Sequence, residues 1–253
     1  MKYAIIAAGE GSRLAEEGIN VPKPLVEIGG ECLIDRLIRI FSQNDAEGIY
    51  VICRAPEGTG SKMQMVDEHL KNIEANGLNG VRVPLHHIVK ATPSSMHSFY
   101  ELSRFLGDAP FVMTTVDTIF REDEFTEYIK TFSTTDCDGM MGVTDYIDDE
   151  KPLYVATAAS EDNGISDITG FLDADPEKRC TYISGGIYGL KPVALKTLQR
   201  CMDSGQSRMR NFQRGLIDDN NNLKAFAFTK VMDIDHASDI DKAENFLRDT
   251  QNS

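Results

Sequence analysis

Short apolar runs alternate with longer amphipathic segments along the chain, and this alternation constrains the fold more than any other feature. The runs at 3–8, 48–53 and 110–116 have the length and composition of buried strands. Between the first two, the segment at 32–41 places its apolar residues at helical spacing. Strands that alternate with helices are typical of βαβ units, so we expect an α/β fold whose mainly parallel sheet carries helices on both faces.

The same criteria divide the rest of the chain. We expect further strands at 81–89, 139–144, 182–190 and 225–234, and further helices at 65–73, 94–106, 122–132, 193–202, 208–217 and 237–247. Two more strands, at 153–159 and 165–172, flank an Asn-Gly pair and are predicted to form a β-hairpin. The second part of the chain thus changes character, and the sheet is expected to be mixed.

The composition excludes several classes of protein. The chain has 26 lysines and arginines against 40 aspartates and glutamates, and this net charge of −14 argues against binding to nucleic acids or to an anionic membrane surface. No apolar run approaches the roughly eighteen residues of a transmembrane helix, and the first run is too short for a signal peptide, so we expect a cytoplasmic protein. The five cysteines include no CxxC pair, so neither a disulfide framework nor a zinc site is expected.

The loop after the first strand carries the most informative motif. It reads Ala-Ala-Gly-Glu-Gly-Ser-Arg-Leu from Ala7 to Leu14, and a Pro-Lys-Pro segment centred on Lys23 follows. A Gly-x-Gly turn lets backbone amides approach phosphate oxygens, and the cations Arg13 and Lys23 suit a polyphosphate. Leu14 stands where a dinucleotide fingerprint needs its third glycine, and the Gly-Lys-Ser/Thr of a Walker A loop is absent. The alternative interpretation is a solvated turn with two surface cations.

This loop, together with the Pro-Lys-Pro-Leu-Val-Glu-Ile-Gly-Gly stretch after it, resembles the signature of the NTP-transferase (sugar-nucleotidyltransferase-like) family. The resemblance implies a Rossmann-like three-layer α/β/α fold of the nucleotide-diphospho-sugar transferase type. It also implies a reaction that joins an NTP to a phosphorylated small molecule and releases pyrophosphate. We expect one domain over 1–253, with a nucleotide-binding half at 1–145 and an acceptor-binding half at 146–253.

The resemblance also implies roles within the loop. Arg13 would hold the leaving phosphates and Lys23 the α-phosphate, so both are predicted catalytic residues. A serine at position 12 is similar to the phosphocholine cytidylyltransferase branch, and its hydroxyl can donate to a phosphate. The glycines would wrap the triphosphate, and the alanines would lie beside the base or ribose. The predicted nucleotide-binding residues of the loop are Ala7, Ala8, Gly9, Gly11 and Ser12.

Aspartates at two strand ends are candidate metal ligands. Asp117 ends a strongly apolar strand, in the crevice where open α/β sheets bind ligands, although it could instead be a turn or capping residue. Asp233 and Asp235 would share a face if the strand continued through both. The resemblance implies that Asp117 is catalytic and coordinates Mg²⁺ together with Asp235. Asp233 is a further candidate ligand, and Asp239 is expected to be a residue of the last helix that its dipole favours. Carboxylates, triphosphate oxygens and water suit this hard cation.

Two further segments complete the predicted site. Ser94 and Ser95 begin a predicted helix, and the resemblance implies that they contact the base and ribose, whereas a helix cap is the alternative for Ser94. Gly185 and Gly186 lie in a predicted strand. The resemblance implies that they line the acceptor pocket, and close backbone packing is the alternative.

We therefore expect a Mg²⁺-dependent nucleotidyltransferase whose partners are an NTP and a phosphorylated small molecule, either a sugar 1-phosphate or a phosphocholine-like acceptor. Val116 stands where the family usually carries glycine or alanine, and the segment at 171–176 lacks the usual Phe-x-Glu-Lys-Pro pattern. These departures leave open a nucleotide or nucleotide-sugar sensor without turnover. The Asp233-Ile-Asp235 motif leaves open a metal-dependent glycosyltransferase of similar topology.

Overall fold

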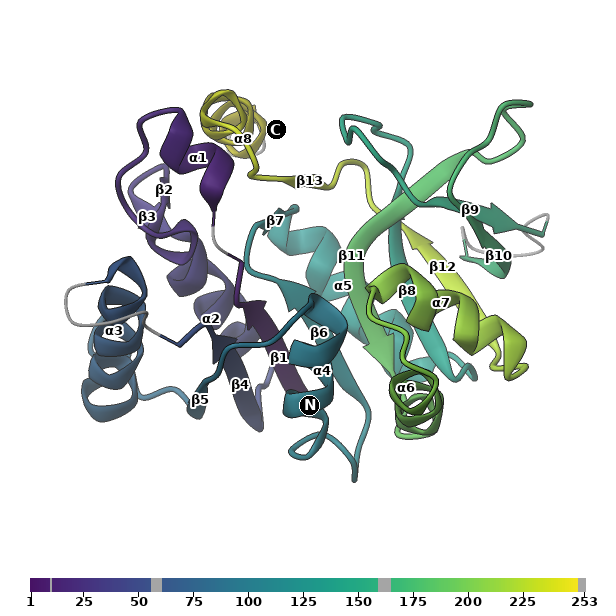
Figure 1. The fold of residues 1–253 in the computed structure, drawn as a ribbon, viewed down its shortest axis with the longest axis horizontal. Coiled ribbons are helices and arrows are strands. Elements are labelled where there is room, and N and C mark those ends of the chain that lie inside the picture. Colours follow the sequence, from purple (N-terminus) through teal and green to yellow (C-terminus); the bar gives the residue numbers. More distant parts are fainter. Residues whose placement is uncertain (10, 56–60, 159–164, 250–253) are drawn as a thin grey trace.

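The computed structural model describes residues 1–9, 11–55, 61–158 and 165–249 of the chain, and its centre is a nine-stranded sheet (Figure 1). In spatial order the strands are β5 (Leu85–Val89), β4 (Gly48–Cys53), β1 (Lys2–Ala7), β6 (Phe111–Thr115), β11 (Tyr182–Leu190), β8 (Gly139–Thr144), β12 (Leu223–Ala227), β10 (Ile165–Leu172) and β9 (Tyr154–Thr157).

The two ends of this sheet differ in strand direction. At one end β5, β4, β1 and β6 are parallel to one another. At the other end β11 is antiparallel to β6 and β8, and β10 is antiparallel to β12 and β9, while β12 and β8 are parallel. The predicted α/β fold with a mixed sheet is confirmed, and its run of four parallel strands is formed by the first 115 residues.

Helices cover both faces of the sheet (Figure 1). One face carries α2 (Leu33–Gln43), α3 (Lys62–Asn76) and α5 (Glu122–Thr134), and the other carries α4 (Ser95–Ser103), α6 (Ala194–Asp203) and α7 (Met209–Asp218). Along β1, Tyr3 and Ile5 pack in the first of these cores, whereas Ala4 and Ile6 pack in the second. Both faces of the strand are apolar, so both must be covered. None of the helices in the described residues is long and apolar enough to span a membrane.

The prediction of one strand over 225–234 is wrong. After β12 the chain leaves the sheet, and Glu124 Oε1 accepts a hydrogen bond from the Thr229 amide at 2.9 Å. The chain then forms the short strand β13 (Met232–Asp233), which is antiparallel to β7 (Thr118–Ile119). Because the strand ends early, residues 232–233 pair with β7, which follows the end of β6.

Several boundaries also differ from the predicted ones. β5 begins at Leu85 and not at residue 81, because Pro84 has no amide hydrogen to donate to a strand ladder. β9 and β10 are antiparallel neighbours, as the predicted hairpin requires. The Asn-Gly turn predicted between them lies outside the described residues. The predicted C-terminal helix is α8 (Ala237–Asp249). Short elements that the sequence pattern did not predict are α1 (Ser12–Glu16), the 3-10 turn η1 (Lys23–Leu25), β2 (Glu27–Ile28) and β3 (Glu31–Cys32).

Candidate functional site

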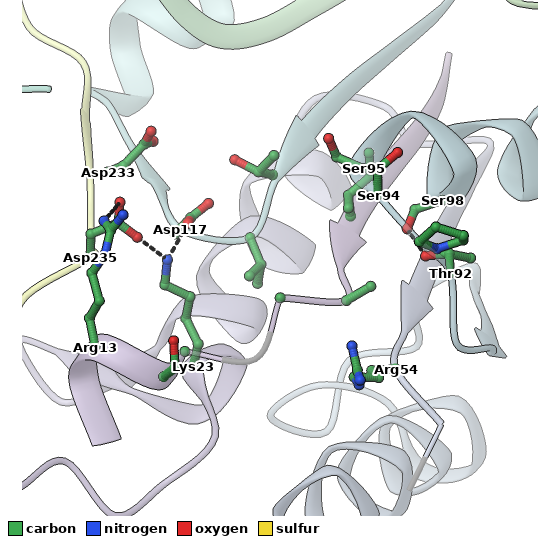
Figure 2. Close-up of a pocket in the computed structure, with 18 residues that line it drawn as sticks. Arg13, Lys23, Arg54, Thr92, Ser94, Ser95, Ser98, Asp117, Asp233 and Asp235 are labelled. Atoms are coloured by element: carbon green, nitrogen blue, oxygen red, sulfur yellow. Dashed lines mark hydrogen bonds and ion pairs between the residues drawn. The ribbon is translucent and has the colours of Figure 1, made fainter. Parts of the chain in front are cut away.

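A cleft of about 580 Å³ opens at the carboxyl ends of β1, β4 and β6 (Figure 2). This is the edge at which open α/β sheets bind ligands. The predicted site residues that line it are Ala8, Gly9, Gly11, Ser12, Arg13, Lys23, Ser94, Ser95, Asp117 and Asp235. The fold thus brings together residues that lie more than two hundred positions apart in the sequence.

The glycine loop and the lysine segment form one structural unit. Gly11 has a φ of +63°, a left-handed conformation that favours glycine, and it caps α1. A Cβ atom at Gly11 would lie 3.1 Å from the Cβ of Lys23, so glycine also permits close packing between the two segments. The glycine loop therefore also positions the lysine.

Lys23 begins the 3-10 turn η1 between two prolines. The Leu25 amide donates to the Pro22 carbonyl at 2.8 Å, and the Val26 amide donates to the Lys23 carbonyl at 3.1 Å. Pro22 and Pro24 restrict φ on either side of the lysine, which stiffens its backbone. The Lys23 side chain is only 8% exposed, and its ammonium points into the cleft (Figure 2).

A short two-stranded ribbon brings the aspartates together. Asp117 precedes β7, and Asp233 in β13 pairs with Thr118 in β7. The Ile234 amide then donates to the Asp117 carbonyl at 3.2 Å. Because β13 ends at Asp233, the shared strand face considered for Asp233 and Asp235 does not form. All three carboxyl groups nevertheless line the cleft (Figure 2).

Asp239 takes the helix-terminal position predicted for it. Its Oδ2 accepts hydrogen bonds from the amides of Asp235 at 3.1 Å and His236 at 2.8 Å, at the start of α8. Glu17 lies just after α1 and accepts from the Ala237 amide at 2.6 Å. These contacts hold the backbone of Asp235 against the glycine-loop region.

The cations and carboxylates of the cleft are bonded to one another. Lys23 Nζ donates to Asp117 Oδ2 and, at 2.7 Å, to Asp235 Oδ1. Arg13 Nη1 donates to Asp235 Oδ2 at 3.0 Å. Burial opposes the charge of Lys23, but Asp117 and Asp235 outweigh it and hold the pKa of the lysine well above its usual range. The predicted phosphate-binding cations thus neutralise the predicted metal-binding carboxylates.

Asp233 is the third carboxyl group at this end of the cleft. Its side chain is exposed on the wall of the cleft. Crowding by surrounding protein atoms and repulsion from Asp117 and Asp235 raise the pKa of Asp233 above its usual range.

The donor set fits a hard divalent cation. No group of three or more His, Cys, Asp or Glu side chains within the described residues has the arrangement of a complete metal site. Mg²⁺, however, is usually held by one or two carboxylates, with substrate phosphates and water as its other ligands. Asp117 and Asp235 could supply such a pair, since their oxygens already converge on the Lys23 ammonium.

Hydroxyl groups and an arginine line the other end of the cleft. Ser94 is the N-cap of α4 and accepts from the His97 amide at 3.4 Å, so its capping role is confirmed. Thr92 Oγ1 lies 2.6 Å from Ser98 Oγ. Arg54, which directly follows β4, also lines this end (Figure 2). Arg54 was not predicted, although its place after a parallel strand is a signal that could have found it.

A second pocket of about 270 Å³ adjoins the cleft and shares Arg13, Asp233 and Asp235 with it. Its other walls come from the chain at 144–151, from β11 and from the start of α8. The predicted acceptor residue Gly185 lies in this wall, where a Cβ atom would be 3.1 Å from the Gly142 carbonyl oxygen. The two pockets meet at the aspartates.

Two predicted site residues line neither pocket. Ala7 is fully buried in β1, where it pairs with Cys53 of β4. Gly186 has a φ of +71°, and a Cβ atom there would lie 3.3 Å from Thr118 Oγ1. The left-handed backbone and the close packing at this position therefore explain why a glycine stands there.

Known proteins resemble this chain in sequence and in fold. The glucose-1-phosphate cytidylyltransferase of Salmonella typhimurium is 35% identical over 72 residues, a match that spans 28% of this chain and 26% of that protein. A structure of UDP-glucose pyrophosphorylase complexed with UDP-glucose covers 99% of both chains, with a TM-score of 0.77 and 14% identity. The inositol-1-phosphate CTP transferase from T. maritima covers 97% of both chains, with a TM-score of 0.73 and 16% identity.

The two solved structures establish the likeness of fold, including the sheet that carries the cleft. The family model described as nucleotidyl transferase matches residues 2–250, which is nearly the whole chain. On this match, the chain belongs to the nucleotidyl transferase family.

Proposed function

We propose that this protein transfers a nucleoside monophosphate from an NTP to a phosphorylated small molecule and releases pyrophosphate. One observation carries the proposal. Arg13 and Lys23 meet Asp117 and Asp235 where a long cleft joins a second pocket. A nucleotide in the cleft and a phosphorylated acceptor in the second pocket would bring their reactive phosphates to this junction.

The chemistry needs positioning and charge neutralisation more than proton transfer. An acceptor phosphate oxygen attacks the α-phosphorus, a new P–O bond forms, and the bond from the α-phosphorus to the bridging oxygen breaks. Pyrophosphate leaves with the electron pair. Because a phosphate nucleophile is already ionised near neutral pH, no strong general base is required.

Named residues would divide this work. Lys23 would contact the α-phosphate and stabilise the charge that develops on it, while Arg13 would hold the departing phosphates. Gly9 and Gly11 would offer backbone amides to the triphosphate. Asp117 and Asp235 would hold Mg²⁺, which when bound supplies neutralisation of the phosphate charge.

This placement sets the orientation of the nucleotide. If the triphosphate lies by Lys23, the base and ribose point toward Thr92, Ser95 and Arg54 at the opposite end of the cleft. In this proposal the half at 1–145 supplies most of the nucleotide cleft and the half at 146–253 most of the acceptor pocket. Asp233 and Asp235 would serve both.

A pyrophosphate-release assay tests the proposal. ATP, GTP, CTP, UTP and dTTP would each be combined with Mg²⁺ and with glucose 1-phosphate, inositol 1-phosphate or phosphocholine. The first two acceptors are chosen because the named relatives act on them. Release that requires one NTP, one acceptor and Mg²⁺ is the expected result, with EDTA as the control. Binding of NTP without release would indicate a sensor, and sugar transfer from a nucleotide sugar would indicate a glycosyltransferase.

A further inference from the structure

We propose that the Lys23 ammonium occupies the divalent-cation position of the ligand-free protein, so that metal binding must displace it. This inference rests on the proposed function and concerns the order in which the site is filled. It assigns Lys23 a second role, as an internal counter-ion, beside its proposed contact with phosphate.

The contacts of Lys23 carry this inference. Its Nζ bonds both Asp117 Oδ2 and Asp235 Oδ1, the two carboxylates that fit a metal ion. The lysine side chain is 8% exposed and Asp117 is 18% exposed, so water does little to screen the pair. Arg13 neutralises the other oxygen of Asp235 at 3.0 Å.

Geometry makes the two cations mutually exclusive. Mg²⁺ binds carboxylate oxygens at about 2.0–2.1 Å. A divalent cation held by these two carboxylates would lie close to the ammonium that now bonds both of them, and two positive charges at short range repel strongly. Metal binding therefore requires the lysine to leave, and the α-phosphate offers it a new anionic partner.

The consequence is an exchange of partners. Triphosphate draws Lys23 and Arg13 away from the aspartates and so opens the metal site, while metal on the aspartates frees the two cations for phosphate. Each ligand removes an obstacle to the other, and the effect is reciprocal by thermodynamic linkage. The ligand-free protein is thereby expected to bind divalent metal weakly.

The first test measures metal binding alone. Mn²⁺ is titrated into the wild-type protein and into Lys23→Met, without nucleotide, and free Mn²⁺ is followed by electron paramagnetic resonance. We expect Lys23→Met to bind Mn²⁺ at least about tenfold more tightly, within the usual range of coupling between sites. Lys2→Met is the matched control, because Lys2 forms a partly buried ion pair with Asp108 elsewhere. Equal affinity in the wild type and Lys23→Met would overturn the inference.

The second test uses the wild-type protein, so it does not depend on the folding of a variant. Amine acylation is quantified at each lysine by mass spectrometry as Mg²⁺ is added. Displacement predicts that labelling of Lys23 rises several-fold while labelling of Lys2 is unchanged. If acylation of Lys23 did not change at saturating Mg²⁺, the ammonium and the metal would bind at the same time, and the inference would be wrong. Neither test uses turnover, so an inactive protein with displaced Lys23 would refute only the proposed function.

Discussion

The cleft and the second pocket share three residues, yet the fold builds them in different ways. The cleft lies at the carboxyl ends of neighbouring parallel strands, so the loops that follow β1, β4 and β6 all contribute to its wall. The second pocket is assembled from antiparallel β11, the chain at 144–151 and the start of α8. Parallel strands gather their loops at one edge, and this regularity is absent from the second pocket.

The charges of the two pockets also differ in arrangement. In the cleft, Lys23 is almost fully buried and bonds two aspartates. In the second pocket, Lys242 is 41% exposed and contacts Asp148 at 2.8 Å and Asp239 at 3.1 Å. Charge pairs near solvent contribute little to stability, whereas removal of one partner of a buried pair is costly. Substitutions in the cleft are thus expected to have the larger effects.

The largest effect is expected at the centre of the cleft. Lys23→Ala and Asp117→Ala should each lower kcat by at least about a hundredfold, the scale of removing one electrostatic stabiliser. Steady-state pyrophosphate release measures this loss. Lys2→Ala and Asp108→Ala remove an ion pair far from the cleft and should keep kcat within about twofold. Near-normal turnover in either cleft variant would refute the assigned roles.

A smaller effect is expected at the end of the cleft that Arg54 lines, where the proposed function puts the base and ribose. Arg54→Gln should raise the KM for the preferred NTP about tenfold, as expected for loss of a charged hydrogen bond. Because the proposed contact is with the base or ribose, the Kd for inorganic pyrophosphate should change by less than about twofold. Isothermal titration supplies that Kd. If the affinities for NTP and for pyrophosphate fell by the same factor, Arg54 would instead contact the phosphates.

The second pocket offers a matched pair of glycine substitutions. Gly185→Ala places a Cβ atom 3.1 Å from the Gly142 carbonyl and 3.2 Å from a Val231 methyl, so the wall must shift. We expect the KM for the acceptor to rise several-fold, a loss of about 1 kcal/mol typical of mild overpacking, while the KM for NTP is unchanged. Gly170→Ala in β10 meets only the Ala156 Cβ, at 4.0 Å, and serves as the control. A rise in the KM for NTP alone would show that Gly185 acts on the cleft and not on the second pocket, which would contradict the prediction.

The smallest effect is expected outside both pockets, between α3 and α2. His69 Nε2 lies 2.6 Å from Asp35 Oδ1, and this hydrogen bond raises the pKa of the histidine above its usual 6.5. The pair should therefore stabilise the fold fully below about pH 6.5 and lose its contribution as pH rises through the folded-state pKa. The free energies of unfolding of the wild type and His69→Gln in urea should differ by about 1 kcal/mol or less at pH 5.5, and the difference should shrink as pH rises through the folded-state pKa of the histidine. If the difference in the free energy of unfolding grew with pH, the predicted pH dependence would be wrong.

Much of the cleft was predictable because its signals are local. Gly11 and Lys23 are identified by a glycine turn and a Pro-Lys-Pro segment within 16 residues of chain. Asp117 is identified by the apolar strand before it. Arg54 has the same kind of position after β4, but a lone arginine after a strand carries no motif and was missed.

Other features could not be predicted because they depend on contacts between distant segments. The strand predicted over 225–234 breaks where Glu124 binds Thr229, more than a hundred residues away in sequence. No local pattern contains that contact. The same holds for the pairing of β13 with β7, which places Asp235 beside Lys23.

Local patterns were sufficient for the α/β class, for most elements and for the glycine and lysine segments, since hydrophobic periodicity and turn chemistry act over a few residues. Only the tertiary structure decided that Lys23 bonds both Asp117 and Asp235, that Gly186 is a packing residue, and that two pockets meet at the aspartates. Such pairings arise when distant segments are desolvated together, and the free energy that selects them is a property of the assembled core rather than of any segment.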